Sequence, residues 1–87
     1  MSIWGVRMIE ARQIKAARAL LGWSQDDLVK AAKLSLTTIR RMEDAEIGTG
    51  RSSAANVSEV QRVLEDAGVM FIAKNGGGAG VRLASSS

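Results

Sequence analysis

The chain has 87 residues, a formal net charge of +3 and no histidine, cysteine, tyrosine or proline. This length suits one small domain. The missing residue types exclude Ser-His-Asp and Cys-His catalysis, Cys/His zinc sites, disulfides and tyrosine chemistry. An enzyme would have only carboxylates and lysines as acids and bases, so we expect no enzymatic activity, no cofactor and no metal. No apolar segment is long enough for a signal or a membrane span, and we therefore expect a cytoplasmic protein without membrane binding.

The charged side chains are unevenly distributed along the chain. Residues 1–42 carry eight basic and three acidic side chains, a net charge of +5. Residues 43–87 carry four basic and six acidic side chains, a net charge of −2. This distribution predicts a basic front half that faces a polyanion and a rear half with a different task.

The front of the chain predicts an arm and a helix. Residues 1–8 have no clear period and are expected to form a flexible arm. From residue 9 to residue 21 good helix formers dominate, and Gly22 ends the helix. Its apolar side consists of Ile14, Ala17 and Leu21, with Leu20 beside them.

Two short helices are predicted next, each with a serine at its start. Ser24 caps a helix that ends near residue 32, and Ser35 caps a helix from residue 36 to about residue 44. Their inward residues are expected to be Leu28, Val29, Ala32, Ile39 and Met42. Two short helices joined by a tight turn, after a longer amphipathic helix, are typical of a helix-turn-helix.

The rear half predicts a loop, a fourth helix and two strands. Residues 45–53 read as a loop, and Asn56 with Glu59 forms a capping arrangement for a helix that Gly68 closes. The inward face of this helix is expected to hold Val57, Val60, Leu64 and Ala67. Residues 69–72 and 81–83 are rich in strand formers around a glycine run, which predicts a hairpin or two strands that pair with a partner chain. Residues 85–87 are expected to be a disordered tail. The fold class is thus mainly α: a four-helix DNA-binding domain over 9–68 and a β segment over 69–84.

The third predicted helix carries the candidate DNA-reading face. A recognition helix must present an exposed polar side to a groove about as wide as a helix. Leu36 can contact a thymine methyl, Thr37 can hydrogen-bond a base edge, and Arg41 can bind guanine through two hydrogen bonds. We therefore expect these three residues to contact bases. The backbone amides near Ser24 and Ser35 are candidate anion sites, since helix N-termini attract phosphate.

The run SQDDLVKAAKLSLTTIRRME, residues 24–43, resembles the XRE (Cro and phage-repressor-like) family of helix-turn-helix regulators. The resemblance rests on its Ser-Gln opening, on Leu28, on Ser-x-x-Thr-Ile and on the closing Arg-x-x-Glu, and it extends over roughly residues 10–68. It implies a lambda-repressor-like bundle and sequence-specific binding of double-stranded DNA, usually as a repressor.

The resemblance also implies individual roles. Gln25 would contact a phosphate and brace the start of the third helix. Arg40 would lie toward the DNA backbone or a flanking base, and Arg51 toward the DNA backbone. Arg18 and Glu43 match a pair that typically forms a partly buried salt bridge between helices one and three.

Lys33 departs from the family pattern, which has glycine at this turn. A left-handed conformation there costs a lysine about 1 kcal/mol. Either the turn is reshaped, or Lys33 compensates as a phosphate contact. Ala45 likewise replaces a common glycine, and the predicted strands stand where the family has a fifth helix.

The C-terminal β segment could serve only as a lid that closes the four-helix core, or it could form a homodimer. We expect the homodimer, because an apolar strand edge is stabilised by burial against a second copy. A dimer would place two recognition helices one DNA turn apart on a palindromic site. Its interface would consist of Val69, Phe71, Ile72, Val81 and Leu83. The alternative function is a protein-binding helix-turn-helix module, an antitoxin or antiactivator that sequesters a larger protein through the same apolar segment.

Overall fold

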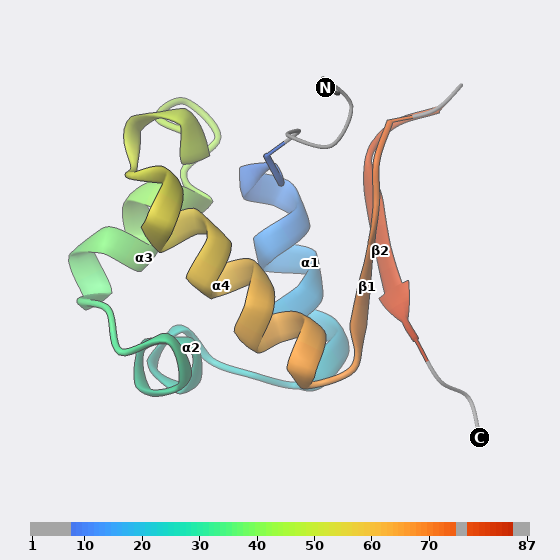
Figure 1. The fold of residues 1–87 in the computed structure, drawn as a ribbon, viewed down its shortest axis with the longest axis horizontal. Helices are drawn as coiled ribbons and strands as arrows, with labels where there is room; N and C mark the ends of the chain where they lie inside the picture. The colour runs from blue at the N-terminus through green and yellow to red at the C-terminus, as the bar shows by residue number, and fades with distance from the viewer. Residues whose placement is uncertain (1–7, 75–76, 85–87) are drawn as a thin grey trace.

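The computed structural model of the chain describes residues 8–74 and 77–84. Its elements, in chain order, are α1 (Ala11–Leu21), α2 (Gln25–Ala32), α3 (Leu36–Glu43), the 3-10 helix η2 (Thr49–Arg51), α4 (Ala54–Asp66), β1 (Val69–Ile72) and β2 (Gly80–Leu83) (Figure 1). The predicted mainly α fold, with four helices, a helix-turn-helix and a C-terminal hairpin, is confirmed. The expected arm up to residue 7, the tail at 85–87 and residues 75–76 of the glycine run lie outside the described residues.

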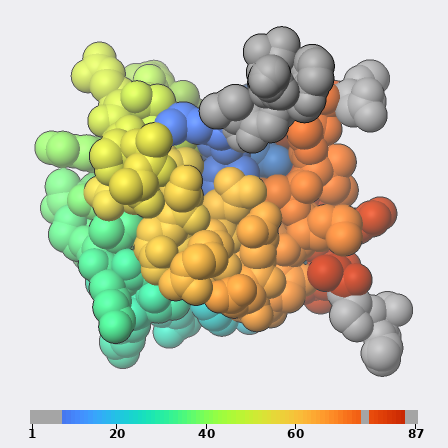
Figure 2. Space-filling model, in the orientation of Figure 1, coloured from blue at the N-terminus to red at the C-terminus, as the bar shows by residue number. Residues whose placement is uncertain are grey.

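The helix-turn-helix and the hairpin lie at opposite ends of the molecule. In Figure 1 the longest axis is horizontal, with α2 and α3 toward one end and the hairpin at the other. The principal extents are 35 × 32 × 21 Å. Helix α1 lies between α4 and the hairpin, and in the space-filling view α4 covers the middle of the visible face (Figure 2). The two surfaces that the sequence predicts as interfaces are therefore well separated.

The core lies among the four helices and β1. Its largest fully buried side chains are those of Ile14, Leu28, Ile39, Met42, Val60 and Leu64, all at predicted inward positions. Leu20 is 43% exposed, because six residues beyond Ile14 it lies about 120° around the helix. Ala67 is also exposed, since it is the C-cap of α4, where the chain turns toward β1.

Two helix starts differ from the prediction. Helix α1 begins at Ala11, and Ile9 before it is a buried core residue. Helix α4 begins at Ala54, because the hydroxyl of Ser53 accepts a hydrogen bond of 3.1 Å from the backbone N–H of Asn56. The predicted cap at Asn56 is thus wrong: two good capping residues stand three positions apart, and their types alone do not rank them.

The turn between α2 and α3 has the backbone conformation that the family pattern implies. Lys33 has φ 58° and ψ 42°, the left-handed region, and its N–H donates to the carbonyl of Val29 at 2.8 Å. Of the two outcomes expected for this position, reshaping of the turn did not occur. Lys33 therefore carries the conformational strain that glycine would avoid.

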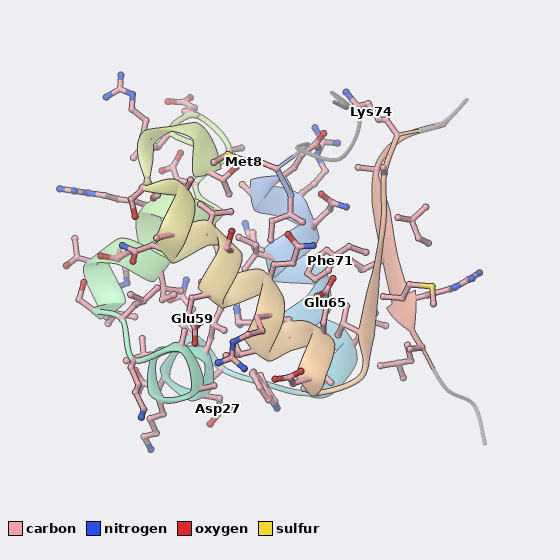
Figure 3. The ribbon with its side chains drawn as sticks, in the orientation of Figure 1. Met8, Asp27, Glu59, Glu65, Phe71 and Lys74 are labelled. Carbon is pink, nitrogen blue, oxygen red and sulfur yellow. The ribbon has the colours of Figure 1, made fainter. Side chains whose placement is uncertain are left out.

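The hairpin packs on the helices through one face. Strands β1 and β2 are antiparallel, with Phe71 opposite Val81 and Val69 opposite Leu83. Phe71 points from β1 toward the helices (Figure 3), and it packs with Val81 against the core. Val69 is only 2% exposed. Its expected place in a dimer interface is therefore wrong, because its side chain is already buried within its own chain.

Two buried polar side chains hold the ends of the fold together, and neither was expected from the sequence. The side-chain N–H groups of Gln13 donate to the carbonyls of Ile72 at 3.2 Å and Gly80 at 3.0 Å, while its side-chain oxygen accepts from the N–H of Glu10 at 2.7 Å. The hydroxyl of Thr49 donates to the carbonyl of Ile9 at 2.7 Å.

Among the described helices, none is both long and apolar enough to cross a membrane.

Candidate nucleic-acid interface

Helix α3 has one buried side and one exposed polar side. Ile39 and Met42 are fully buried, whereas Thr37, Arg40 and Arg41 are exposed. Leu36 is half-buried beside them. Positions three and four apart are neighbours on a helix surface, so these four side chains form one patch. The structure thus brings the predicted base-contacting residues together.

The two arginines of this patch carry charges that the protein does not neutralise directly. Within residues 8–74 and 77–84, neither Arg40 nor Arg41 forms an ion pair or a side-chain hydrogen bond. Arg62 on α4 differs, since it binds the carboxylates of Glu59 and Asp66 at 2.6 and 2.8 Å. The cations of α3 are therefore available to an external anion.

A buried ion pair holds the inner side of α3. The guanidinium of Arg18 donates to both carboxylate oxygens of Glu43, at 2.6 and 2.8 Å, and also to the carbonyl of Trp23 at 3.0 Å. The two ion-paired side chains are 17% and 3% exposed. Hydrogen bonding to Glu43 raises the pKa of Arg18 above its ordinary value. The predicted partly buried salt bridge between α1 and α3 is confirmed.

Gln25 joins this ion pair at the start of α2. Its side-chain N–H donates to a carboxylate oxygen of Glu43 at 3.1 Å. This hydrogen bond goes to the last residue of α3, which lies against α2 in the folded chain. The expected brace to the start of α3 stays a prediction. Gln25 also borders a shallow hollow with Ser24, Asp26, Leu36 and Arg40. Its predicted phosphate contact stays a prediction.

The two helix N-termini differ in charge. At α2, Ser24 and Asp27 exchange hydrogen bonds of 2.8 and 3.0 Å between side chain and backbone, and Asp26 adds a second carboxylate to the first turn. These carboxylates oppose an anion at that end. At α3 the first turn has no acidic residue, and Ser35 caps it by accepting from the N–H of Thr38 at 3.1 Å. The start of α3 is the better candidate for a phosphate.

The two remaining predicted backbone contacts lie in different surroundings. Arg51 is exposed at the end of η2, which packs against α3. Lys33 is exposed in the α2–α3 turn, and its charge acts on Glu59 of α4. The pKa of Glu59 is lowered first by hydrogen bonding to Arg62 and then, among weaker causes, by the charge of Lys33. The structure therefore places Arg51 beside α3, whereas the charge of Lys33 also acts on a residue of α4.

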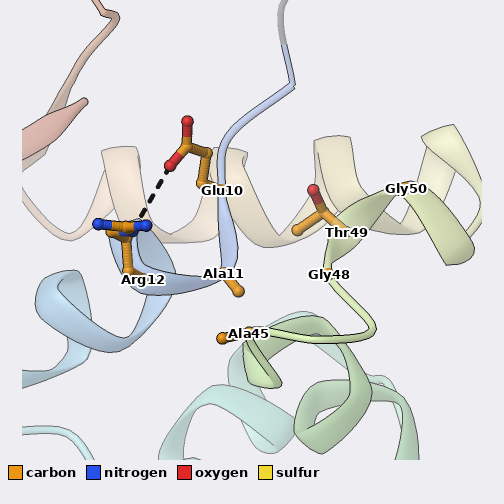
Figure 4. A pocket seen from close by; sticks show the side chains of 7 residues that line it. All are labelled: Glu10, Ala11, Arg12, Ala45, Gly48, Thr49 and Gly50. Atoms are coloured by element: carbon orange, nitrogen blue, oxygen red, sulfur yellow. Dashed lines mark ion pairs between the residues drawn. The ribbon is translucent and has the colours of Figure 1, made fainter. Parts of the chain in front are cut away.

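A second surface hollow lies between the start of α1 and the loop before η2 (Figure 4). Its charged lining residues are Glu10 and Arg12, which pair at 3.7 Å. Small residues make up the rest of its lining: Ala11, Ala45, Gly48, Thr49 and Gly50. Over the described part of the chain, no group of three or more histidine, cysteine or acidic residues is arranged to hold a metal ion.

No protein-family model matches this sequence, and no curated protein matches it. The resemblance to the XRE family thus stays an expectation that rests on residues 24–43.

Proposed function

We propose that this chain is a sequence-specific DNA-binding transcriptional regulator of the XRE type. It acts in the cytoplasm as a repressor and binds a palindromic double-stranded operator as a homodimer. The observation that carries the proposal is the two-sided character of α3. Ile39 and Met42 are fully buried on one side, and Arg40 and Arg41 are exposed on the other without an ion-pair partner among the described residues.

A helix of this kind suits the major groove. The groove is about 12 Å wide, close to the diameter of an α-helix with its side chains. Sequence is read only if the side chains meet the bases in one register, which requires a helix that does not rock on its support. The ion pair between Arg18 and Glu43, with the added donor from Gln25, supplies such a support at the inner side of α3.

The residues of this candidate interface divide into two roles in the proposal. Leu36, Thr37 and Arg41 read base edges, as a thymine-methyl contact, a hydrogen bond and a bidentate guanine contact. Arg40 and Arg51 neutralise phosphates, with Gln25 and Lys33 contributing at the edge of the interface. The net charge of +5 over residues 1–42 supports attraction of the phosphate backbone.

Fluorescence anisotropy tests the proposal. Labelled DNA from upstream of the protein's own gene is titrated with the full chain over a salt series, beside a scrambled duplex of equal length and base composition. We expect much tighter binding to the upstream duplex and a steep loss of affinity with salt. Equally weak binding to both duplexes would contradict the proposal.

A protein-binding module, an antitoxin or antiactivator, is the second candidate function. One observation favours it: Met70, Ile72 and Leu83 on the hairpin are 39%, 38% and 49% exposed. Apolar side chains on a short sheet provide surface for a larger protein. This second function would be supported if the chain bound neither duplex and instead formed a stable complex with the product of a neighbouring gene.

A further inference from the structure

Strand β2 has one edge paired with β1 and a second edge open to pairing. In an antiparallel ladder, hydrogen-bonded and non-hydrogen-bonded residue pairs alternate. The N–H of Ala84 donates to the carbonyl of Gly68 at 2.7 Å, so this is a hydrogen-bonded pair. Arg82 lies two positions before Ala84, so its backbone N–H and C=O groups also bond to β1. The N–H and C=O groups of Val81 and Leu83 then point to the outer edge of β2. Within the described residues, those outward groups make no hydrogen bond to another element.

Both strands contact helices: β1 contacts α4 and α1, and β2 contacts α1. They differ in exposure, since Val69 at the start of β1 is 2% exposed, whereas Leu83 opposite it at the end of β2 is 49% exposed. Because β2 has the more exposed end, we take its outer edge as the one to which another strand is added.

We propose that two copies of this chain join along the outer edge of β2 as one antiparallel four-stranded sheet, with Val81 opposite its own copy. This register also pairs Ala79 with Leu83 and Gly80 with Arg82, a ladder of five described residues. The long side chain of Arg82 then lies opposite a glycine. A register centred on Arg82 would set two guanidinium groups directly opposite each other, which is destabilising.

The position of α3 favours joining the edges over stacking the sheet faces. In Figure 1 the two strands nearly overlap, so the sheet is seen almost edge-on, with the helices on one side of it and α3 at the far end. In one continuous sheet the two-fold axis runs perpendicular to the sheet, and the helices of both copies lie on the same side. Both copies of α3 then face the same way. This step rests on the proposed function, since one DNA duplex must meet both recognition helices.

Stacking through the outer face of the hairpin gives the opposite geometry. Met70 and Ile72 lie on that face, because their neighbours in β1 point toward the helices. A dimer built on them would place the two copies of α3 at its two far ends, facing away from each other. Such a dimer leaves one recognition helix without DNA.

The mass of the full chain, measured without DNA, tests whether two copies pair along the outer edge of β2. By light scattering after size exclusion we expect a dimer, twice the chain mass of 9.2 kDa. Leu83→Pro removes an outward N–H while leaving the bonds inside the hairpin intact, so the mass should fall to that of the monomer with an unchanged circular-dichroism spectrum. The matched control Met70→Asp, on the outer face and 39% exposed, should stay dimeric. A wild-type monomer, or a dimer lost in Met70→Asp and kept in Leu83→Pro, would overturn the proposal.

Cross-linking tests the register, since the chain has no cysteine of its own. In the proposed register Val81→Cys meets itself across a hydrogen-bonded pair with Cα atoms about 5.5 Å apart, within the range of a disulfide. We expect mild oxidation to convert Val81→Cys to a covalent dimer much faster than Arg82→Cys. Faster cross-linking of Arg82→Cys would reject this register. Because both readouts are taken without DNA, a β2-joined dimer that binds no operator would contradict the proposed function alone.

Discussion

The carboxylate of Glu43, at the last residue of α3, accepts two hydrogen bonds from the guanidinium of Arg18 in α1, at 2.6 and 2.8 Å. The side-chain amide of Gln25 in α2 adds a third donor at 3.1 Å. One buried carboxylate therefore connects α1, α2 and α3. Because the bidentate geometry is directional, it restricts how α3 is presented to the solvent.

Removing one partner of this ion pair should destabilise the fold strongly. Arg18→Met leaves the carboxylate of Glu43 buried without its cation, and we expect the free energy of unfolding to fall by about 3 kcal/mol. The double variant Arg18→Met/Glu43→Leu should recover most of this loss, since no charge is then buried. Urea denaturation measures both. Arg62→Ala, which removes two exposed ion pairs, is the control and should change stability much less than Arg18→Met, because exposed ion pairs contribute little. If Arg18→Met lowered the free energy of unfolding no more than Arg62→Ala, the strong contribution expected of the Arg18–Glu43 pair would be contradicted.

The Gln13 amide should hold the hairpin on α1. Gln13→Leu has a similar volume but leaves the N–H of Glu10 and the carbonyls of Ile72 and Gly80 without this partner, so we expect a loss of about 1–3 kcal/mol. Hydrogen exchange of the β1 amides should accelerate more than that of α3.

Gln61→Leu is the matched control for this variant, because among the described residues the amide of Gln61 bonds to Glu65 of its own helix, α4, and to no backbone group of the hairpin. If the two variants exchange alike over β1, the hairpin is held by apolar packing alone.

Lys33 should be the position at which glycine stabilises the chain. Its left-handed conformation costs a residue with a side chain about 1 kcal/mol, and Lys33→Gly should raise the free energy of unfolding by about that amount. Lys33→Ala keeps the strain and removes the charge, so it should not stabilise. The two variants should bind operator DNA equally, and more weakly than the wild type if the ammonium contacts a phosphate. Stabilisation by alanine equal to that by glycine would refute the strain argument.

Arg41 should carry base specificity and Arg51 general affinity. Arg41→Ala should weaken operator binding by about 1–3 kcal/mol and scrambled DNA little, because it removes a base contact. Arg51→Ala should weaken both duplexes alike and lower the salt dependence. Lys74→Ala is the control, since this lysine is 61% exposed and follows β1, at the end of the molecule opposite α3 (Figure 3). Equal losses on both duplexes for Arg41→Ala would reject its role in base reading.

Local signals predicted most of the fold. The serine caps of α2 and α3 and the spacing of Leu28, Ile39 and Met42 depend on residues within one or two turns, so the sequence shows them directly. The sequence does not decide between Ser53 and Asn56 as the cap of α4, because both are good capping residues. Gln13 and Thr49 were missed for another reason: polar residues in a helical or loop segment look like surface residues until their distant partners are known.

Local periodicity and composition were enough to predict the helix-turn-helix, the exposed cations of α3 and the uneven charge. The packing of the folded chain was needed to show that Val69 is buried in its own core, that Gln25 reaches Glu43, and that the hairpin lies at the opposite end from α3. The bonds from Gln13 to the hairpin join residues 59 and 67 positions apart. Contacts of that range depend on how whole elements pack against one another, and no local pattern of residues encodes them.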